Sequence, residues 1–307
     1  MILNSFVELD KNKFPVVIFG SGPAGLSLAL ELEKKNINCV LIEAGDEYYT
    51  DESQSYFKIN TEGTNLRDIS NSRLRQFGGT SASWGGWCKP LSDFDIKKTG
   101  LNPEEIKKYQ SKTCEILGIN NSFRESLINE DFNQIEFQYS ETSFYEKYFS
   151  HIKKSKKILL LLNTQLSHFE GQNKKIEKAI CISNGKFFDI QSREFILCCG
   201  GIENSRILLW TKFKNKNLLK DNFNIGKYWM THYWILGGIG FVDLKNFKSF
   251  MQNNFLDREG EIHIASNENN LKNKLQLGLY LSTSEDQNFI KEMVKSILCI
   301  APEYGKK

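Results

Sequence analysis

A glycine-rich turn between two apolar runs constrains this chain more than any other feature. Val16 to Phe19 are four consecutive apolar residues, and Gly20 to Gly25 then read G-x-G-x-x-G. A short, continuously apolar run of β-formers predicts a strand that is buried on both faces. Ala24 to Lys35 has apolar residues at helical spacing, and Cys39 to Ile42 predicts a second strand. The stretch therefore predicts a βαβ unit.

The residues of this turn suit the pyrophosphate of a dinucleotide. Gly20 permits the tight turn, Gly22 lets the backbone approach the phosphates, and Gly25 lets the helix pack on the strand. The start of the helix adds free N–H groups and a positive dipole end. Glu43 follows the second strand, where a carboxylate can accept hydrogen bonds from ribose. It disfavours NADP, whose 2′-phosphate it would repel, but does not separate NAD from FAD.

Composition excludes several other classes of protein. The 307 residues, 40% hydrophobic and 25% charged, are ordinary for a globular chain of one or two domains. A net charge of +3 gives no argument for nucleic acid or an anionic membrane as a partner. Seven cysteines without framework spacing and four histidines without metal-ligand spacing predict reduced, mostly buried thiols, no metal site and a cytoplasmic protein. Neither a signal peptide nor a membrane span is predicted.

Two further glycine-rich stretches follow. Arg73 to Trp87 holds two Gly-Gly pairs around small hydroxyl residues, a loop that can lie flat against a planar ring or a pyrophosphate. Its tryptophans, Trp84 and Trp87, need burial, which argues against a merely mobile loop. Glu194 to Leu209 predicts a buried strand, a glycine turn and a helix, the pattern of another β-to-α connection in a doubly wound sheet.

Local signals predict several other elements. Asn102 and Pro103 begin a helix over residues 102 to 117 that Gly118 ends. Asn184-Gly185 between apolar runs predicts a type I′ hairpin. Residues 46 to 70 are polar and predict an irregular crossover. Later strands are predicted over residues 234 to 242, 261 to 265 and 275 to 282.

Together the glycine-rich stretches resemble the glucose–methanol–choline (GMC) oxidoreductases, FAD enzymes that act on alcohols and sugars. G-S-G-P-A-G with L-I-E-A-G is similar to the N-terminal signature of that family, and F-G-G-T-S-A-S-W-G-G-W to its second flavin loop. Glu194 to Leu209 resembles its second signature. Asp93 to Asp95 resembles the bacterial, choline-dehydrogenase-like branch. The resemblance implies an α/β, Rossmann-like FAD-binding domain of the GMC and para-hydroxybenzoate-hydroxylase-like type, with a partial antiparallel-sheet substrate domain.

The resemblance also implies a set of cofactor contacts and no covalent flavin link. The implied contacts are Gly20, Ser21, Gly22, Pro23, Ala24, Gly25, Glu43, Ala44, Arg75, Gly78, Gly79, Thr80, Ser83, Trp84, Gly85, Leu166, Cys198, Cys199 and Gly200. Some relatives bind flavin covalently through a histidine where this chain has Ser83, so we expect non-covalent FAD. The family usually has alanines near Cys198 and Cys199, so we interpret both as packing residues. His232 lies in a G-R-x-x-x-D-H-like segment, with Thr231 in place of aspartate, and a structural role is favoured for it.

The resemblance covers most of residues 14 to 240 and then fades. It predicts an FAD-binding domain over residues 1 to 232, with a lid or excursion over about 46 to 150, and the incomplete start of a substrate domain over 233 to 307. The family places its catalytic histidine in a C-terminal segment, but no histidine follows His263 here. We therefore expect a truncated or fragmentary member, or one completed by another chain, with the catalytic residue unknown and no alcohol turnover by this chain alone.

The activity implied by the resemblance is hydride transfer from a CH–OH group of an alcohol or sugar to flavin N5, while a base takes the hydroxyl proton. Two alternatives stay open. One is a non-catalytic flavin-binding protein, which the missing catalytic segment favours. The other is a different class of FAD or NAD oxidoreductase, which the absence of C-x-x-C and of a suitably placed Tyr-x-x-x-Lys pair weakens.

Any bound flavin should leave the protein when it is denatured by acid or heat. Ser83 cannot form a histidyl–flavin bond, so nothing at that position would hold the cofactor once the fold is lost. The measurement is the absorbance spectrum of the supernatant after precipitation. Yellow colour that stays with the precipitated protein would contradict the expectation.

Overall fold

The structure, a computed structural model, describes residues 2–3, 9–62, 69–221, 223–229, 262–267 and 278–281. The chain divides into two compact units, Met1–Gly86 with Ser140–Ile235 and Trp87–Tyr139 with Leu236–Lys307. The segment predicted as an excursion, residues 46 to 150, is thus divided at Gly86 and Ser140. Thr231, His232 and the strand predicted over 234 to 242 lie outside the described residues, as does most of the predicted domain over 233 to 307.

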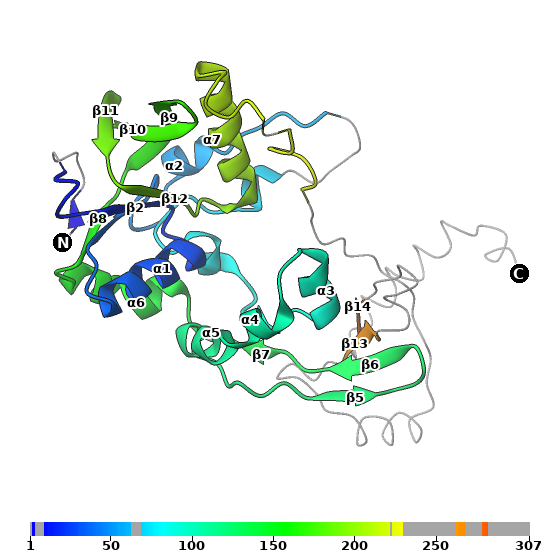
Figure 1. Cartoon of the computed structure of the whole chain (residues 1–307). Coiled ribbons are helices and arrows are strands. Elements are labelled where there is room, and N and C mark those ends of the chain that lie inside the picture. Colours follow the sequence, from blue (N-terminus) through cyan, green and yellow to red (C-terminus); the bar gives the residue numbers. More distant parts are fainter. Residues whose placement is uncertain are drawn as a thin grey trace, which may run out of the picture. The chain divides into compact units, whose positions relative to one another are not determined.

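The first unit is built on a five-stranded parallel sheet (Figure 1). In order across the sheet, the strands are β1 (Ile2–Leu3), β8 (Ile158–Leu161), β3 (Cys39–Ile42), β2 (Val16–Phe19) and β12 (Glu194–Leu197). All neighbouring pairs are parallel, and β2 and β3 have the predicted bounds. From β2 the chain crosses to β3 on one side, while β12 lies on the other. Open α/β sheets bind ligands at such a switch point, outside the carboxyl ends of the strands.

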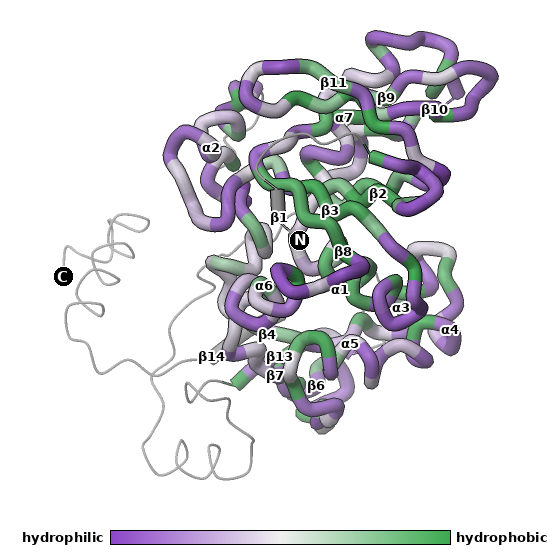
Figure 2. The backbone as a smooth tube through the Cα atoms, turned by 90° about the vertical axis from the view of Figure 1, so that its left-hand side faces the viewer, coloured by the Kyte–Doolittle hydropathy of each residue, from purple (hydrophilic) through white to green (hydrophobic). Residues whose placement is uncertain are grey.

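Two layers cover this sheet. Helices α1 (Pro23–Lys34) and α6 (Phe144–Lys154) pack on one face. On the other face lie α7 (Gly200–Lys214) and an antiparallel sheet of β9 (Thr164–Gln172), β10 (Lys175–Ser183) and β11 (Lys186–Gln191). Side chains alternate along a strand, so Val17 and Phe19 share a core with Phe169 of β9. Figure 2 shows β2, β3 and β8 as hydrophobic throughout, as burial on both faces requires.

The hairpin prediction is confirmed, and two helix predictions need correction. Asn184 and Gly185 both have positive φ, 50° and 72°, as a type I′ turn requires. The helix predicted over 102 to 117 is interrupted, because α4 (Pro103–Lys107) and α5 (Gln110–Leu117) are separate. Sequence signals marked its two ends and nothing marked the break. The crossover predicted as irregular contains α2 (Asp51–Ser55), which is too short for a periodicity signal and begins at a Thr50 N-cap.

The second unit is antiparallel. Its four-stranded sheet has the order β14 (Gly278–Leu281), β13 (Ile262–Ser266), β6 (Phe132–Ile135) and β5 (Glu125–Leu127), and β4 (Trp87–Cys88) pairs with β7 (Gln138–Tyr139). Helix α3 (Asp93–Lys98) precedes α4. The strands predicted over 261 to 265 and 275 to 282 correspond to β13 and β14. Pairing of β13 with β6 joins this late segment to residues 87 to 139. None of the helices in the described part of the chain is long and apolar enough to cross a membrane.

Gly25→Ala should destabilise the first unit. A Cβ at Gly25 would lie 1.9 Å from the carbonyl oxygen of Gly20 and 3.3 Å from the Cβ of Cys198, so helix and strand would have to separate. Overpacking of this kind typically costs about 1–3 kcal/mol, and we expect a loss near the upper end in urea unfolding. Gly22→Ala is the matched control, because no atom lies within 4 Å of its added Cβ and its φ of −69° suits alanine. Equal unfolding midpoints for the two variants would contradict this packing.

Candidate functional site

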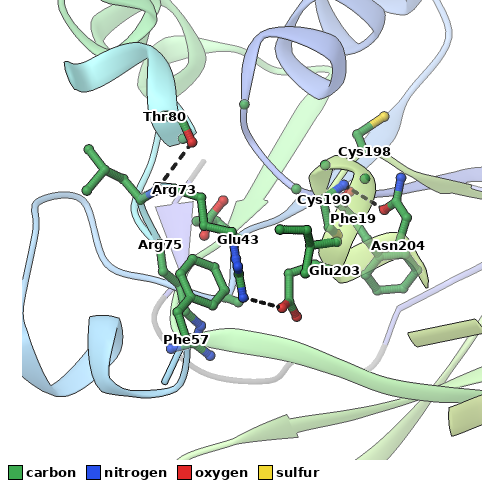
Figure 3. A pocket seen from close by; sticks show the side chains of 18 of the residues that line it. Phe19, Glu43, Phe57, Arg73, Arg75, Thr80, Cys198, Cys199, Glu203 and Asn204 are labelled. Atoms are coloured by element: carbon green, nitrogen blue, oxygen red, sulfur yellow. Dashed lines mark hydrogen bonds and ion pairs between the residues drawn. The ribbon is translucent and has the colours of Figure 1, made fainter. Parts of the chain in front are cut away.

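The carboxyl edge of the parallel sheet opens into a cavity of about 1140 Å³. Its wall combines the turn after β2, the ends of β3 and β12, the start of β9, the N-terminal part of α7 and residues from 69 to 84. Figure 3 shows the side chains of 18 of the residues that line it. Pockets for drug-sized ligands span roughly 300–1,000 Å³, so this volume suits an extended ligand such as a dinucleotide.

Most of the predicted contact residues meet at this wall. Those that line it are Gly20, Gly22, Pro23, Ala24, Glu43, Ala44, Arg75, Gly79, Thr80, Trp84, Leu166, Cys198, Cys199 and Gly200. The wall does not include Ser21, Gly25, Gly78, Ser83 and Gly85. Ser21, Gly25 and Gly78 support it from behind, because Ser21 binds Glu43, Gly25 packs on Gly20, and the Gly78 N–H donates to the Ser21 carbonyl. Ser83 and Gly85 are exposed.

The carboxylate of Glu43 is buried and accepts three hydrogen bonds. Oε2 accepts from the backbone N–H of Ser21 at 3.0 Å and from its hydroxyl at 2.7 Å. Oε1 accepts from the backbone N–H of Gly45 at 2.8 Å. A carboxylate has about four acceptor positions, so Oε1 keeps one for another donor. Glu43 thus ties the first glycine turn to the end of β3 while it still lines the cavity.

The two glycine loops lie against each other. Gly20 has a φ of 99° and donates its N–H to the carbonyl of Ile42 at 2.8 Å, which fixes the first turn to β3. A Cβ on Gly79 would lie 3.0 Å from the Gly22 Cα, so the second loop reaches the first because Gly79 has no side chain. Gly79 also has a positive φ of 56°, which an alanine would rarely adopt.

Two helices begin at the cavity wall with their positive dipole ends. The N-cap residues, Gly22 of α1 and Cys199 of α7, make no side-chain capping hydrogen bond. Pro23 at the first position of α1 has no N–H to satisfy. Helix N-termini of this kind favour negative charge and attract phosphate groups. Both converge on one edge of the sheet because β2 and β12 are parallel neighbours.

An ion-pair cluster that the sequence did not predict crosses one side of the cavity. Arg73 Nη2 donates to Glu203 Oε1 at 3.1 Å, and Arg206 Nε donates to Glu203 Oε2 at 2.6 Å. Figure 3 shows Arg73 and Glu203 reaching toward each other from different elements. Arg73 also lies 4.2 Å from the ring centroid of Phe57. Its Nε is buried without a hydrogen-bond partner among the described residues, so the cavity wall has a donor to spare.

Both terminal nitrogens of Arg75 donate hydrogen bonds within the protein. Nη1 donates to Ser53 Oγ at 2.9 Å, and Nη2 donates to Gln165 Oε1 at 2.8 Å. Its guanidinium lies 4.6 Å from the ring centroid of Tyr56. Burial lowers the pKa of Arg75, and Glu43 acts in the opposite direction. Arg75 therefore organises the wall from within, and a ligand would meet the groups it positions.

Some wall residues had a sequence signal and others had none. Polar and aromatic residues among those that were missed are Tyr56, Phe57, Arg73, Gln165, Glu203, Asn204 and Arg206. Arg73 and Arg75 are two residues apart, which puts them on the same side of an extended segment. Glu203 and Arg206 are three residues apart, which puts them on the same face of a helix. These spacings are the sequence signals that could have indicated both pairs. Tyr56 and Gln165 belong to no motif.

Cys198 and Cys199 line the cavity as free thiols. Burial raises the pKa of Cys199 to about 12, with Glu43 adding to the effect, and burial also raises the pKa of Cys198. The thiolate is the reactive form of cysteine, so both side chains stay protonated and unreactive at neutral pH. This agrees with their interpretation as packing residues.

Comparisons with known proteins give limited similarity. Residues 15–82 match the family described as Lycopene cyclase protein. No curated protein matches the sequence. Among solved structures, pyridoxine 4-oxidase from Mesorbium loti is similar with a TM-score of 0.46 and 12% identity, over 62% of this chain and 50% of that chain. The chain thus spans about half the length of that oxidase.

Glu43→Ala should destabilise the protein even without a ligand. It leaves the Ser21 and Gly45 donors without their acceptor, and hydrogen bonds to a charged group contribute about 1.5–3 kcal/mol. We expect a loss of about 3 kcal/mol in the free energy of unfolding, measured by urea titration. Ser21→Ala leaves both backbone bonds to Glu43 in place. It removes the hydroxyl bond to Glu43 and the long bond, 3.3 Å, from the Gly78 N–H to Ser21 Oγ, so it should cost less. A Glu43→Ala protein as stable as Ser21→Ala would show that the backbone bonds to this carboxylate contribute little.

Proposed function

We propose that the chain is the cofactor-binding part of a GMC-type oxidoreductase that binds FAD non-covalently and oxidises a CH–OH group of a small alcohol or sugar. One observation carries the proposal. Both glycine loops, the N-termini of α1 and α7, and Glu43 converge on one large cavity at the switch point of the sheet. This is the place where open α/β sheets bind nucleotides.

The residues present fit a dinucleotide. The position of a Cβ on Gly22 has no atom within 4 Å, which leaves room for a phosphate directly at the start of α1. Arg73 Nε is a buried donor without a partner among the described residues. The wall carries Arg73, Arg75 and Arg206 against Glu43 and Glu203, an excess of one positive charge that suits a pyrophosphate.

Each part of the wall then has a role toward FAD. The segment from Gly20 to Ala24 and the dipole of α1 hold the pyrophosphate. Glu43 accepts a hydrogen bond from the ribose through its remaining acceptor position. Ala44 and Leu166 contact the adenine, and the second glycine loop lies along the flavin half. Ser83 leaves the flavin without a covalent link.

The match over residues 15–82 supports a nucleotide-binding element. It spans β2, α1, β3 and the second glycine loop as far as residue 82, the segments that build most of the proposed pyrophosphate site. The activity itself rests on the resemblance of the glycine-rich stretches to GMC enzymes. The substrate class is part of the proposal for the same reason.

When bound, the flavin accepts the hydride from the substrate. The residues of this chain bind and orient the cofactor, and Glu43, Arg73 and Arg75 set the charge around it. No described residue of the first unit is assigned as the base that takes the hydroxyl proton. The binding site and the catalytic step can therefore be tested separately.

Gly22→Ala should bind FAD at least tenfold more weakly, while its fold stays as stable as the natural protein. A methyl group at this position would occupy the open space in front of α1 and keep the phosphates from the helix N-terminus, where the dipole contributes about 0.3–1 kcal/mol and each charge-assisted hydrogen bond about 1.5–3 kcal/mol. The measurement is flavin fluorescence during titration of the apoprotein with FAD.

Two outcomes would contradict the proposal. One is a natural protein that does not bind FAD under conditions in which it is folded. The other concerns the hydride donor, tested by offering primary alcohols, aldoses, polyols and NADH to the FAD-loaded protein without oxygen. Flavin bleaching by NADH and by none of the alcohols or sugars would place the protein in another class of flavoenzyme.

A further inference from the structure

Two arginines of the cavity wall are each stacked on an aromatic ring of the same short segment. Arg73 lies over Phe57 at 4.2 Å and Arg75 over Tyr56 at 4.6 Å, measured from guanidinium carbon to ring centroid. The two rings differ in exposure. Both rings line the cavity, but Phe57 is only 8% exposed whereas Tyr56 is 64% exposed. Since Arg75 covers one side of the Tyr56 ring, the exposed area is on the side away from it.

Hydrogen bonds of Gln54 hold the segment that carries Tyr56 against the segment that carries Arg75. Gln54, two residues before Tyr56, donates from Nε2 to the carbonyls of Ser70 at 3.0 Å and Arg73 at 2.8 Å, and its Oε1 accepts from the Arg75 N–H at 3.2 Å. These buried bonds stitch α2 to the segment that carries both arginines. The Tyr56 backbone is thereby held beside Arg75, and its ring lies against the guanidinium, which lowers the cost of ordering the ring when it stacks on a ligand.

Arg75 also fixes the orientation of Gln165. Its Nη2 donates to Gln165 Oε1 at 2.8 Å, and an arginine has no acceptor, so the amide oxygen must face it. The Nε2 group is then directed away from Arg75. Gln165 lines the cavity, so its amide presents two N–H donors on the side opposite the guanidinium.

Both side chains lie on the base side of the proposed ribose contact. The sheet order β8, β3, β2 places Glu43, which follows β3, between the glycine turn after β2 and the start of β9 after β8. Thr164 donates its N–H to the Glu43 carbonyl at 3.0 Å, so Gln165 follows directly beside that residue. A dinucleotide with phosphates at the turn and ribose at Glu43 extends its base toward Gln165 and Tyr56.

We propose that Tyr56 and Gln165 form a base-recognition corner that binds the adenine of the dinucleotide. Tyr56 stacks on the face of the ring, and Gln165 Nε2 donates a hydrogen bond to one of its ring nitrogens. Arg75 is the positioning residue for both, because it covers the back of Tyr56 and turns the Gln165 amide. The assignment rests on the proposed FAD site and adds to it the residues that choose the base.

The test measures the affinities of FAD and of ADP, which share the adenosine, by fluorescence titration and by displacement of FAD with ADP. Tyr56→Ala should lower the affinity for both ligands roughly tenfold or more, the effect typical of losing one base–aromatic stack. Tyr56→Phe keeps the ring, so its affinities for both ligands should stay within about twofold of those of the natural protein. Tyr49→Ala is the matched control, since Tyr49 is 49% exposed on the same segment but does not line the cavity.

Gln165→Glu tests the Nε2 donor of Gln165 separately from the contact of this side chain with Arg75. The new carboxylate still accepts from Arg75 but offers no N–H. The affinity for both ligands should therefore fall roughly fivefold, the effect of one lost net hydrogen bond. Unfolding by urea shows whether each variant keeps its fold.

The outcomes separate this inference from the proposed function. If the natural protein binds neither FAD nor ADP, the FAD site itself is wrong. If it binds both, and Tyr56→Ala and Gln165→Glu bind them equally well, the base-recognition corner is wrong and the FAD site stands. Weaker binding of FAD with unchanged binding of ADP would also overturn the inference, because the effect would then come from the flavin half.

Discussion

The functional edge of the first unit depends on one buried carboxylate. An ionised group taken out of water is costly unless hydrogen bonds replace its hydration, and Glu43 meets that requirement with donors from Ser21 and Gly45. The same bonds fix the glycine turn after β2 against the end of β3. The bond to Gly45 also fixes the position of that residue. A Cβ there would lie 2.0 Å from the Arg75 carbonyl oxygen, so Gly45 lets the segment that leads into the second glycine loop lie directly against the end of β3.

Glycine serves two different purposes around this corner. At Gly25 and Gly45 the missing Cβ allows backbone to meet backbone, and a side chain there would collide with fixed carbonyl groups. At Gly22 and Gly200 no atom lies within 4 Å of an added Cβ, so the absence of a side chain leaves space at the start of a helix. The first pair holds the wall together, and the second pair keeps it open to a ligand. A sequence motif alone does not distinguish these two uses.

The charged groups of the wall are arranged so that their burial is compensated. Glu203 is shared by Arg73 and Arg206, and Arg75 is covered by Tyr56 while it binds Ser53 and Gln165. Burial lowers the pKa of both Arg73 and Arg75, while Glu203 acts in the opposite direction on both and Glu43 on Arg75. The result is a preorganised surface with a small excess of positive charge, which an anionic ligand would meet without further rearrangement.

The sequence by itself determined the elements whose signals are local. The bounds of β2 and β3, the glycine turn and the Asn184-Gly185 hairpin follow from apolar runs and from backbone conformations that only certain residues adopt. Only the tertiary structure decided which side chains meet at the cavity. Arg75 and Gln165 are 90 residues apart, and Arg73 and Glu203 are 130 apart. Such pairs leave no periodicity or spacing in the chain, because their contact depends on the order of the strands in the sheet.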